Sequence, residues 1–236
     1  AAKASFEAAL PSLGAQRGLI LAGDHADRVE AAVFIGPSYS GGGEPIPERM
    51  VPWEDELDTD RGWAKYNKHH WLRDYRGFLE FFFSRFFAEP HSTKPYEDCV
   101  GWGLETTGET LVTAQYGAKH SPEELRELAQ RVRCRVLVIH GTDDAIVSAT
   151  RGAALADHTG GELVLLEGSG HGPHVRDPVR VNLLLRDFVK PAPPPRRWVR
   201  GKSRRRRALY ISSPIGLGHA QRDAAIADEL RKLHPD

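Results

Sequence analysis

Two short apolar segments, each followed by a polar loop, constrain this chain more than any other feature. Residues 135–140 and 161–167 are both rich in Val, Leu and Ile, and both runs stop at a glycine. Such runs are typical of strands buried on both faces of a parallel sheet. The first loop carries Asp144 and the second carries His171. Because loops that follow parallel strands open on the same edge of a sheet, we expect this carboxylate and imidazole to meet in one crevice.

A carboxylate that is hydrogen-bonded to an imidazole fixes its tautomer and stabilises its protonated form, so the pair can activate a hydroxyl. The loops GTDDAIV (141–147) and GSGHG (168–172), with a closing apolar helix from Pro178, resemble the acid and histidine loops of α/β-hydrolases. The resemblance implies an α/β fold, with a mostly parallel sheet flanked by helices and a helical cap insertion. It favours Asp144 over its neighbour Asp143 as the acid, and it implies a nucleophile earlier in the chain.

Ser12 lies at the position that matches this nucleophile. An apolar segment that reads as a buried helix follows it, then a polar loop, HADRV, and a predicted strand at residues 30–35. The resemblance therefore implies a Ser12–Asp144–His171 triad for hydrolysis of an ester or related bond, with the backbone N–H of Leu13 as one oxyanion donor. A plain alternative for Ser12 is the N-cap of the following helix, where serine is favoured.

The turn around Ser12 departs from the Gly-x-Ser-x-Gly pattern of the family. Leu10 replaces the first glycine, where we expect a clash with the following helix, and Pro11 lacks a backbone donor. The preceding segment, residues 1–10, reads better as a helix than as a strand. We therefore expect either that the hydrolase unit is truncated at its N-terminus or that this copy has lost its nucleophile turn. A non-catalytic, hydrolase-like module is the alternative function.

The stretch between the two predicted halves of the hydrolase unit is rich in aromatic residues. Trp71, Tyr75, Phe78 and Phe82 recur at helical spacing, which predicts a helix. The resemblance to α/β-hydrolases implies a helical cap in this part of the chain, at residues 45–118. Most of these rings are expected in the core of the cap, and some could line an apolar pocket. The adjacent residues at 69–70, both histidines, are predicted to be solvated.

Composition changes after residue 189. Residues 190–207 are rich in Pro and Arg and are predicted to form a linker. Residues 208–236 read as one strand, a glycine loop and a helix, and the segment GHAQR (218–222) resembles the start of a GT-B-type glycosyltransferase. The resemblance implies an incomplete nucleotide-sugar loop. Its residues are Gly216, Gly218, His219 and Arg222. We therefore predict that the chain is part of a hydrolase–glycosyltransferase fusion, with a possible contact between the two parts.

Composition and charge limit the binding partners, the cellular compartment and the metal sites that can be expected. The chain has 236 residues and a formal net charge of +0, so no global charge favours nucleic acid or a membrane surface. Two cysteines give neither a disulfide framework nor metal-ligand spacing, and a cytoplasmic location is the expectation. His174, near His171, lacks an evident third ligand, so no metal and no cofactor is predicted. The expected partner is a small ester-like substrate.

Overall fold

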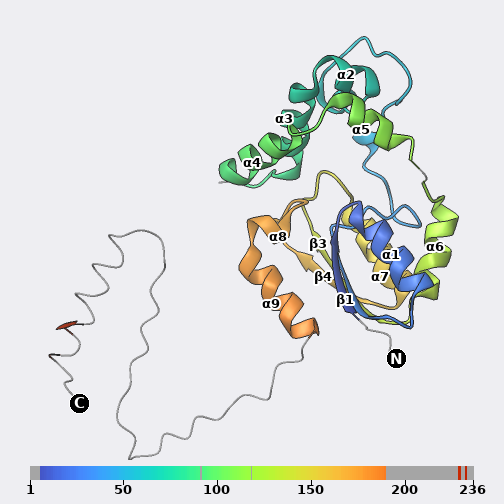
Figure 1. Ribbon diagram of the computed structural model, residues 1–236, viewed down its shortest axis with the longest axis vertical. Coiled ribbons are helices and arrows are strands. Elements are labelled where there is room, and N and C mark those ends of the chain that lie inside the picture. Colours follow the sequence, from blue (N-terminus) through green and yellow to red (C-terminus); the bar gives the residue numbers. More distant parts are fainter. Residues whose placement is uncertain (1–5, 91, 118, 190–227, 230–231, 233–236) are drawn as a thin grey trace, which may run out of the picture. The chain divides into compact units, whose positions relative to one another are not determined.

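The computed structural model describes residues 6–90, 92–117, 119–189, 228–229 and 232. The chain divides into two units, Ala1–Ala192 and Pro193–Asp236. The first unit contains one sheet of four parallel strands in the order β1-β2-β3-β4 (Figure 1). The strands are β1 (Phe6–Pro11), β2 (Val29–Ile35), β3 (Arg135–Gly141) and β4 (Glu162–Leu166).

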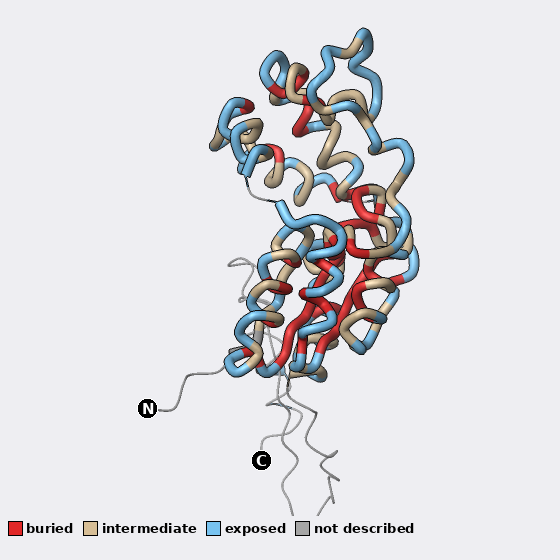
Figure 2. The backbone as a smooth tube through the Cα atoms, turned by 90° about the vertical axis from the view of Figure 1, so that its right-hand side faces the viewer, coloured by how far each residue is buried: buried red, intermediate tan, exposed pale blue. Residues whose placement is uncertain are grey.

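Helices cover both faces of this sheet, because side chains of a strand alternate between its faces. Ala32 and Phe34 of β2 face one core with α1, α6 and α7, whereas Val33 and Ile35 face a second core with α9. These helices are α1 (Gly14–Asp24), α6 (Pro122–Arg131), α7 (Ala149–Thr159) and α9 (Pro178–Val189), and a short helix, α8 (Pro173–Arg176), precedes α9. Figure 2 shows the buried residues concentrated in the strands. The predicted α/β class is confirmed.

The caps of these helices follow from their sequences. Ser121 and Glu124 form a reciprocal capping box at the start of α6. Gly160 ends α7 with a left-handed backbone, at φ 65°, which glycine adopts without a steric penalty. The short turn after Gly160 brings the chain back into β4 beside β3, which sets the histidine loop next to the acid loop.

Two expectations about the strands are wrong. β4 is only partly buried, and Leu165 is 48% exposed, because β4 is the last strand in the sheet order. Residues 6–10 belong to β1 instead of a helix, since pairing with β2 over Phe6–Pro11 overrides the helix preference of the alanines. Residues 1–5 lie outside the described part of the chain.

The segment between β2 and α6 folds into a group of short helices beyond the end of the sheet (Figure 1). They are α2 (Lys68–Arg73), α3 (Tyr75–Phe86), α4 (Thr93–Gly103) and α5 (Gly108–Gln115), preceded by the 3-10 turns η1 (Pro47–Arg49) and η2 (Gly62–Lys65). Their own core is built on Trp71, Phe78 and Leu79. His70 is 3% exposed, so its predicted solvation is wrong: it lies on the inner side of α2 next to Trp71.

Almost all of the tail lies outside the described residues. This applies to the predicted linker at 190–207 and to the nucleotide-sugar loop, with Gly216, Gly218, His219 and Arg222. Of the predicted final helix, Asp228, Glu229 and Lys232 are described, and they are helical. Within the described part of the chain, no helix has the length and apolar character needed to cross a membrane.

Candidate active site

Ser12 occupies a sharp turn between β1 and α1. Its φ of 48° is the one positive φ at a non-glycine position among the described residues. The positive-φ conformation costs a residue with a Cβ atom about 1–3 kcal/mol, so the contacts around Ser12 must hold it in this conformation. The Ser12 N–H donates to the carbonyl of Ile35 at 2.9 Å, and its carbonyl accepts from the N–H of Ser38 at 3.0 Å. These two bonds tie the turn to the end of β2.

The Ser12 hydroxyl does not cap α1. The N-cap position is Leu13, which makes no side-chain cap hydrogen bond. The Ser12 Oγ instead lies 2.8 Å from Nε2 of His171. The backbone N–H of Leu13 is the first donor after Ser12, at the positive end of the helix dipole of α1.

Leu10 does not clash with α1, contrary to expectation, because the helix has a glycine opposite it. A Cβ atom at Gly18 would lie 2.0 Å from Cδ1 of Leu10. Gly18 therefore supplies the space that a glycine at position 10 supplies in the family pattern, and Leu10 packs against the core. Pro11 is tolerated since it lies at the end of β1, the first strand in the sheet order, and is exposed.

Asp144 lies in the loop after β3 and is almost completely buried. Its Oδ1 accepts from the backbone N–H groups of Ile146 and Val147, both at 2.8 Å. Its Oδ2 accepts from His171 Nδ1 at 2.7 Å and from His140 Nε2 at 3.0 Å. Burial by itself raises the pKa of Asp144, but the hydrogen bonds from His140 and His171 outweigh it and hold this pKa well below its usual range.

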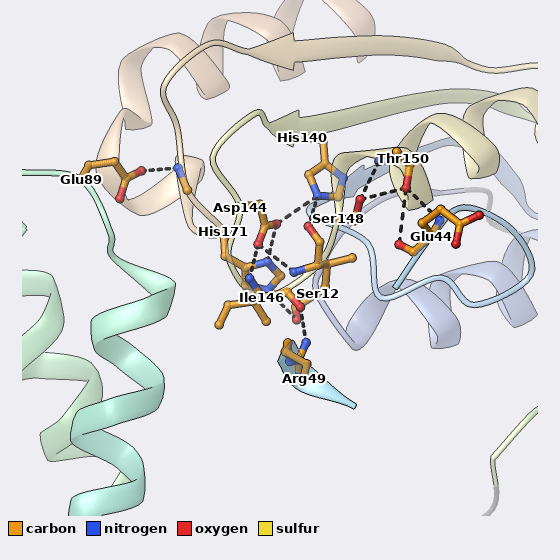
Figure 3. Close-up of polar contacts among 12 residues, drawn as sticks. Ser12, Glu44, Arg49, Glu89, His140, Asp144, Ile146, Ser148, Thr150 and His171 are labelled. Carbon is orange, nitrogen blue, oxygen red and sulfur yellow. Dashed lines mark hydrogen bonds and ion pairs between the residues drawn. The ribbon is translucent and has the colours of Figure 1, made fainter. Parts of the chain in front are cut away.

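His171 connects the acid to the hydroxyl. Its Nδ1 faces Asp144 and its Nε2 faces Ser12, so Ser12, His171 and Asp144 form one continuous chain of hydrogen bonds (Figure 3). The imidazole is 2% exposed. Asp143, the neighbouring alternative, instead accepts a hydrogen bond from the Thr142 hydroxyl. The structure therefore brings together the three predicted side chains from three separate loops.

The cap contacts the histidine loop directly. The Phe86 ring meets the His171 ring edge-on, with centroids 4.8 Å apart. A carboxylate oxygen of Glu89 accepts from the Gly170 N–H at 2.5 Å, and Arg176 donates to the Pro90 carbonyl at 2.9 Å. The end of α3 and the segment after it therefore restrict the position of the imidazole.

A second contact joins the first residues of the predicted cap to the acid loop. Arg49 of η1 donates to the Ile146 carbonyl, and its guanidinium lies 4.7 Å from the centre of the Trp63 ring. Burial lowers the pKa of Arg49, and Asp144 acts in the opposite direction. A positive charge is thus held close to the acid loop.

Sequence reasoning missed several of these residues. His140 had a usable signal, because a histidine at the end of an otherwise apolar buried strand must find a polar partner. Arg49, Phe86 and Glu89 had no such signal in the sequence, since each reaches the site from a distant part of the chain.

His174, predicted not to be a ligand, has its pKa lowered by burial and by the charge of His171. Within the described residues, no three His, Cys, Asp or Glu side chains are placed to hold a metal ion.

Comparisons with known proteins agree with this architecture. Residues 12–182 match the alpha/beta hydrolase family. The chain therefore belongs to the alpha/beta hydrolase family. A search of curated protein sequences gave no match.

Solved structures with the same fold are distant in sequence. They include the esterase RhEst1 from a Rhodococcus species (21% identity, TM-score 0.63, covering 80% of this chain and 66% of that one). A bromoperoxidase from Bacillus anthracis is similar (21% identity, TM-score 0.62, 79% and 68%). A third is the 2-hydroxy-6-oxo-6-phenylhexa-2,4-dienoate hydrolase of Rhodococcus (20% identity, TM-score 0.59, 78% and 64%). The chain spans about two thirds of the length of these proteins.

Proposed function

We propose that this chain carries the active site of a serine hydrolase that cleaves an ester or a related bond. The observation that supports the proposal most is the hydrogen-bonded sequence Ser12–His171–Asp144, with contacts of 2.8 Å and 2.7 Å. The positive φ of Ser12 adds to it, because a serine held in a costly backbone conformation at the end of a strand is typical of a nucleophile turn.

The reaction follows from the direction of these hydrogen bonds. As the Ser12 oxygen attacks the substrate carbonyl, its proton moves to Nε2 of His171, and Asp144 stabilises the imidazolium through Nδ1. We expect the Leu13 N–H to donate to the developing oxyanion, because it is the backbone donor that follows the proposed nucleophile. Collapse of the tetrahedral intermediate transfers the proton from His171 to the leaving alcohol and leaves an acyl group on Ser12. Water then attacks the acyl carbon and gives a proton to His171. The bond between the acyl carbon and the Ser12 oxygen breaks, His171 returns the proton to that oxygen, and the acid is released.

The expected substrates are small esters. Two of the similar structures are named as an esterase and a hydrolase, which supports this class by analogy of fold only. The Phe86 ring beside His171 and the aromatic cap core favour an apolar group next to the scissile bond.

Covalent labelling tests the proposal. A fluorophosphonate probe should label the wild-type protein, and Ser12→Ala should abolish both labelling and hydrolysis of p-nitrophenyl butyrate. Asp144→Asn should retain labelling only at a much lower rate, since related triads lose about 10⁴-fold in kcat when the acid is replaced. Ser84→Ala is the matched control, because its hydroxyl bonds to the Phe81 carbonyl inside the cap.

The alternative is a non-catalytic, hydrolase-like module that positions a glycosyltransferase. The Leu10-Pro11 sequence before Ser12 departs from the family pattern, which is the reason for considering this alternative, although Gly18 leaves room for Leu10 in the structure. A wild-type protein that is folded, as judged by cooperative unfolding, yet is not labelled would contradict the hydrolase and support the module.

We also propose a division into a hydrolase-type part at 1–189 with its cap at 45–118, a linker at 190–207 and the start of a glycosyltransferase-like domain at 208–236. The support for the last part is the GHAQR motif alone. The coding sequence around this segment tests the division. Continuation into further alternating strands and helices after residue 236 would support it, and a stop codon there would contradict it.

A further inference from the structure

Asp144 is in contact with two histidines instead of one. His140, the penultimate residue of β3, is 0% exposed, and its Nε2 lies 3.0 Å from the same Oδ2 that accepts from His171. Figure 3 shows the two imidazoles on either side of this carboxylate. The proposed mechanism needs His171 only, so the second histidine requires an explanation of its own.

The surroundings of His140 determine which of its nitrogens carries the proton. Nε2 also lies 3.0 Å from the carbonyl of Val147, so both of its neighbours are acceptors and Nε2 must be the donor. Nδ1 is buried and has no hydrogen-bond partner among the described residues. A proton on Nδ1 would therefore create a buried positive charge with an unpaired N–H, which is strongly unfavourable.

Helix α7 encloses the same nitrogen. A Cβ atom at Gly152 would lie 2.3 Å from Nδ1 of His140, so this helix passes over the ring with no room for a side chain. Packing on one side and two acceptors on the other fix both the orientation and the tautomer of the ring.

We propose that His140 is a positioning residue that donates its Nε2–H to Asp144 and thereby limits how strongly this carboxylate favours protonation of His171. The inference rests on the proposed function, because it concerns the base of that reaction. A general base must be unprotonated at the working pH. An Asp144 with fewer donors would hold a proton on His171 more tightly, since less of its charge would be neutralised by hydrogen bonds.

Other charged groups face the same centre. Arg49 and His174 act on Asp144 and on His171 respectively, Glu89 is bonded to the N–H that precedes His171, and Arg151 lies on α7. A substitution at position 140 leaves all four in place, so a comparison of variants isolates the contribution of His140.

Titration of His171 by NMR in ¹⁵N-histidine-labelled protein tests the proposal without requiring turnover. His140→Leu removes the donor, and the midpoint of the His171 titration should move to higher pH, since the Asp144 carboxylate then interacts more strongly with a protonated His171. His140→Gln, whose side-chain amide can donate from a similar position, should restore most of the wild-type midpoint. A purely structural role would lower the stability of both variants and leave the midpoint of the His171 titration unchanged. An unchanged midpoint in a folded His140→Leu protein would therefore overturn the proposal.

The wild-type protein supplies a second test that does not depend on the stability of any variant. Its neutral His140 should carry the proton on Nε2, because the Asp144 carboxylate and the Val147 carbonyl both face this nitrogen. A neutral His140 with its proton on Nδ1 would overturn the inference. Failure of fluorophosphonate labelling would instead count against the hydrolase, so the two failures are distinguishable.

Discussion

A methyl group added at Gly141, as in Gly141→Ala, should push the loop of His171 away from the loop of Asp144. Gly141 ends β3, and a Cβ atom built there would lie 2.1 Å from the carbonyl oxygen of Ser169 and 2.3 Å from that of Gly170. Both atoms belong to the backbone just before His171. Ordinary van der Waals contact begins at 3.4 Å, so the histidine loop must move by more than about 1 Å to accept alanine.

The expected magnitude follows from that displacement. Overpacking of this kind costs about 1–3 kcal/mol of stability. A misplacement of about 1 Å in a catalytic group costs about 100-fold in rate. We therefore expect Gly141→Ala to lower kcat/KM for p-nitrophenyl butyrate by about two orders of magnitude and to shift the urea unfolding midpoint downward.

Gly101→Ala is the matched control. It lies in α4 with nothing within 4 Å of the added methyl group, so alanine should stabilise the helix by about 0.5–1 kcal/mol and leave the rate unchanged. A Gly141→Ala protein with wild-type stability and a rate within threefold of wild type would refute the close approach of the two loops.

Two further outcomes are expected. Gly18→Ala should lose about 1–2 kcal/mol of unfolding free energy through its contact with Leu10. In the double variant, Leu10→Ala should relieve part of that loss. Strictly additive changes in unfolding free energy, measured in urea, would contradict the pairing of these two residues. The pKa of Asp144 is depressed, so the contribution of its ionised form to stability is complete above the ordinary pKa of about 3.9 and is lost as the pH falls below that value. The difference in unfolding free energy between wild type and Asp144→Asn should therefore narrow below about pH 4. A difference that stays constant down to about pH 2 would contradict the depressed pKa.

Much of the fold was predictable because local patterns and tertiary structure agree. β2 and β3 are apolar runs with neighbours on both sides, and the helices that follow them have recognisable ends, such as Ser121 and Gly160. Loops after parallel strands meet at one edge of the sheet, and Asp144 and His171 do lie side by side there. Their catalytic roles, and that of Ser12, remain proposals.

The errors arose where tertiary contacts override local preference. The alanine-rich segment before Ser12 has helix propensity, yet pairing with β2 makes residues 6–11 a strand. Leu10 looked incompatible with a tight turn because its partner, Gly18, lies eight residues further along the chain, inside α1. The burial of His70 depends on how α2 packs, which the polarity of a single residue does not reveal.

The backbone of Ser12 has a consequence for how this protein can change. Glycine would adopt a φ of 48° without steric strain, but it would remove the hydroxyl that bonds to His171. Under the proposed mechanism, stability and activity therefore set opposite requirements on residue 12, because the strained backbone is useful only while the hydroxyl is needed.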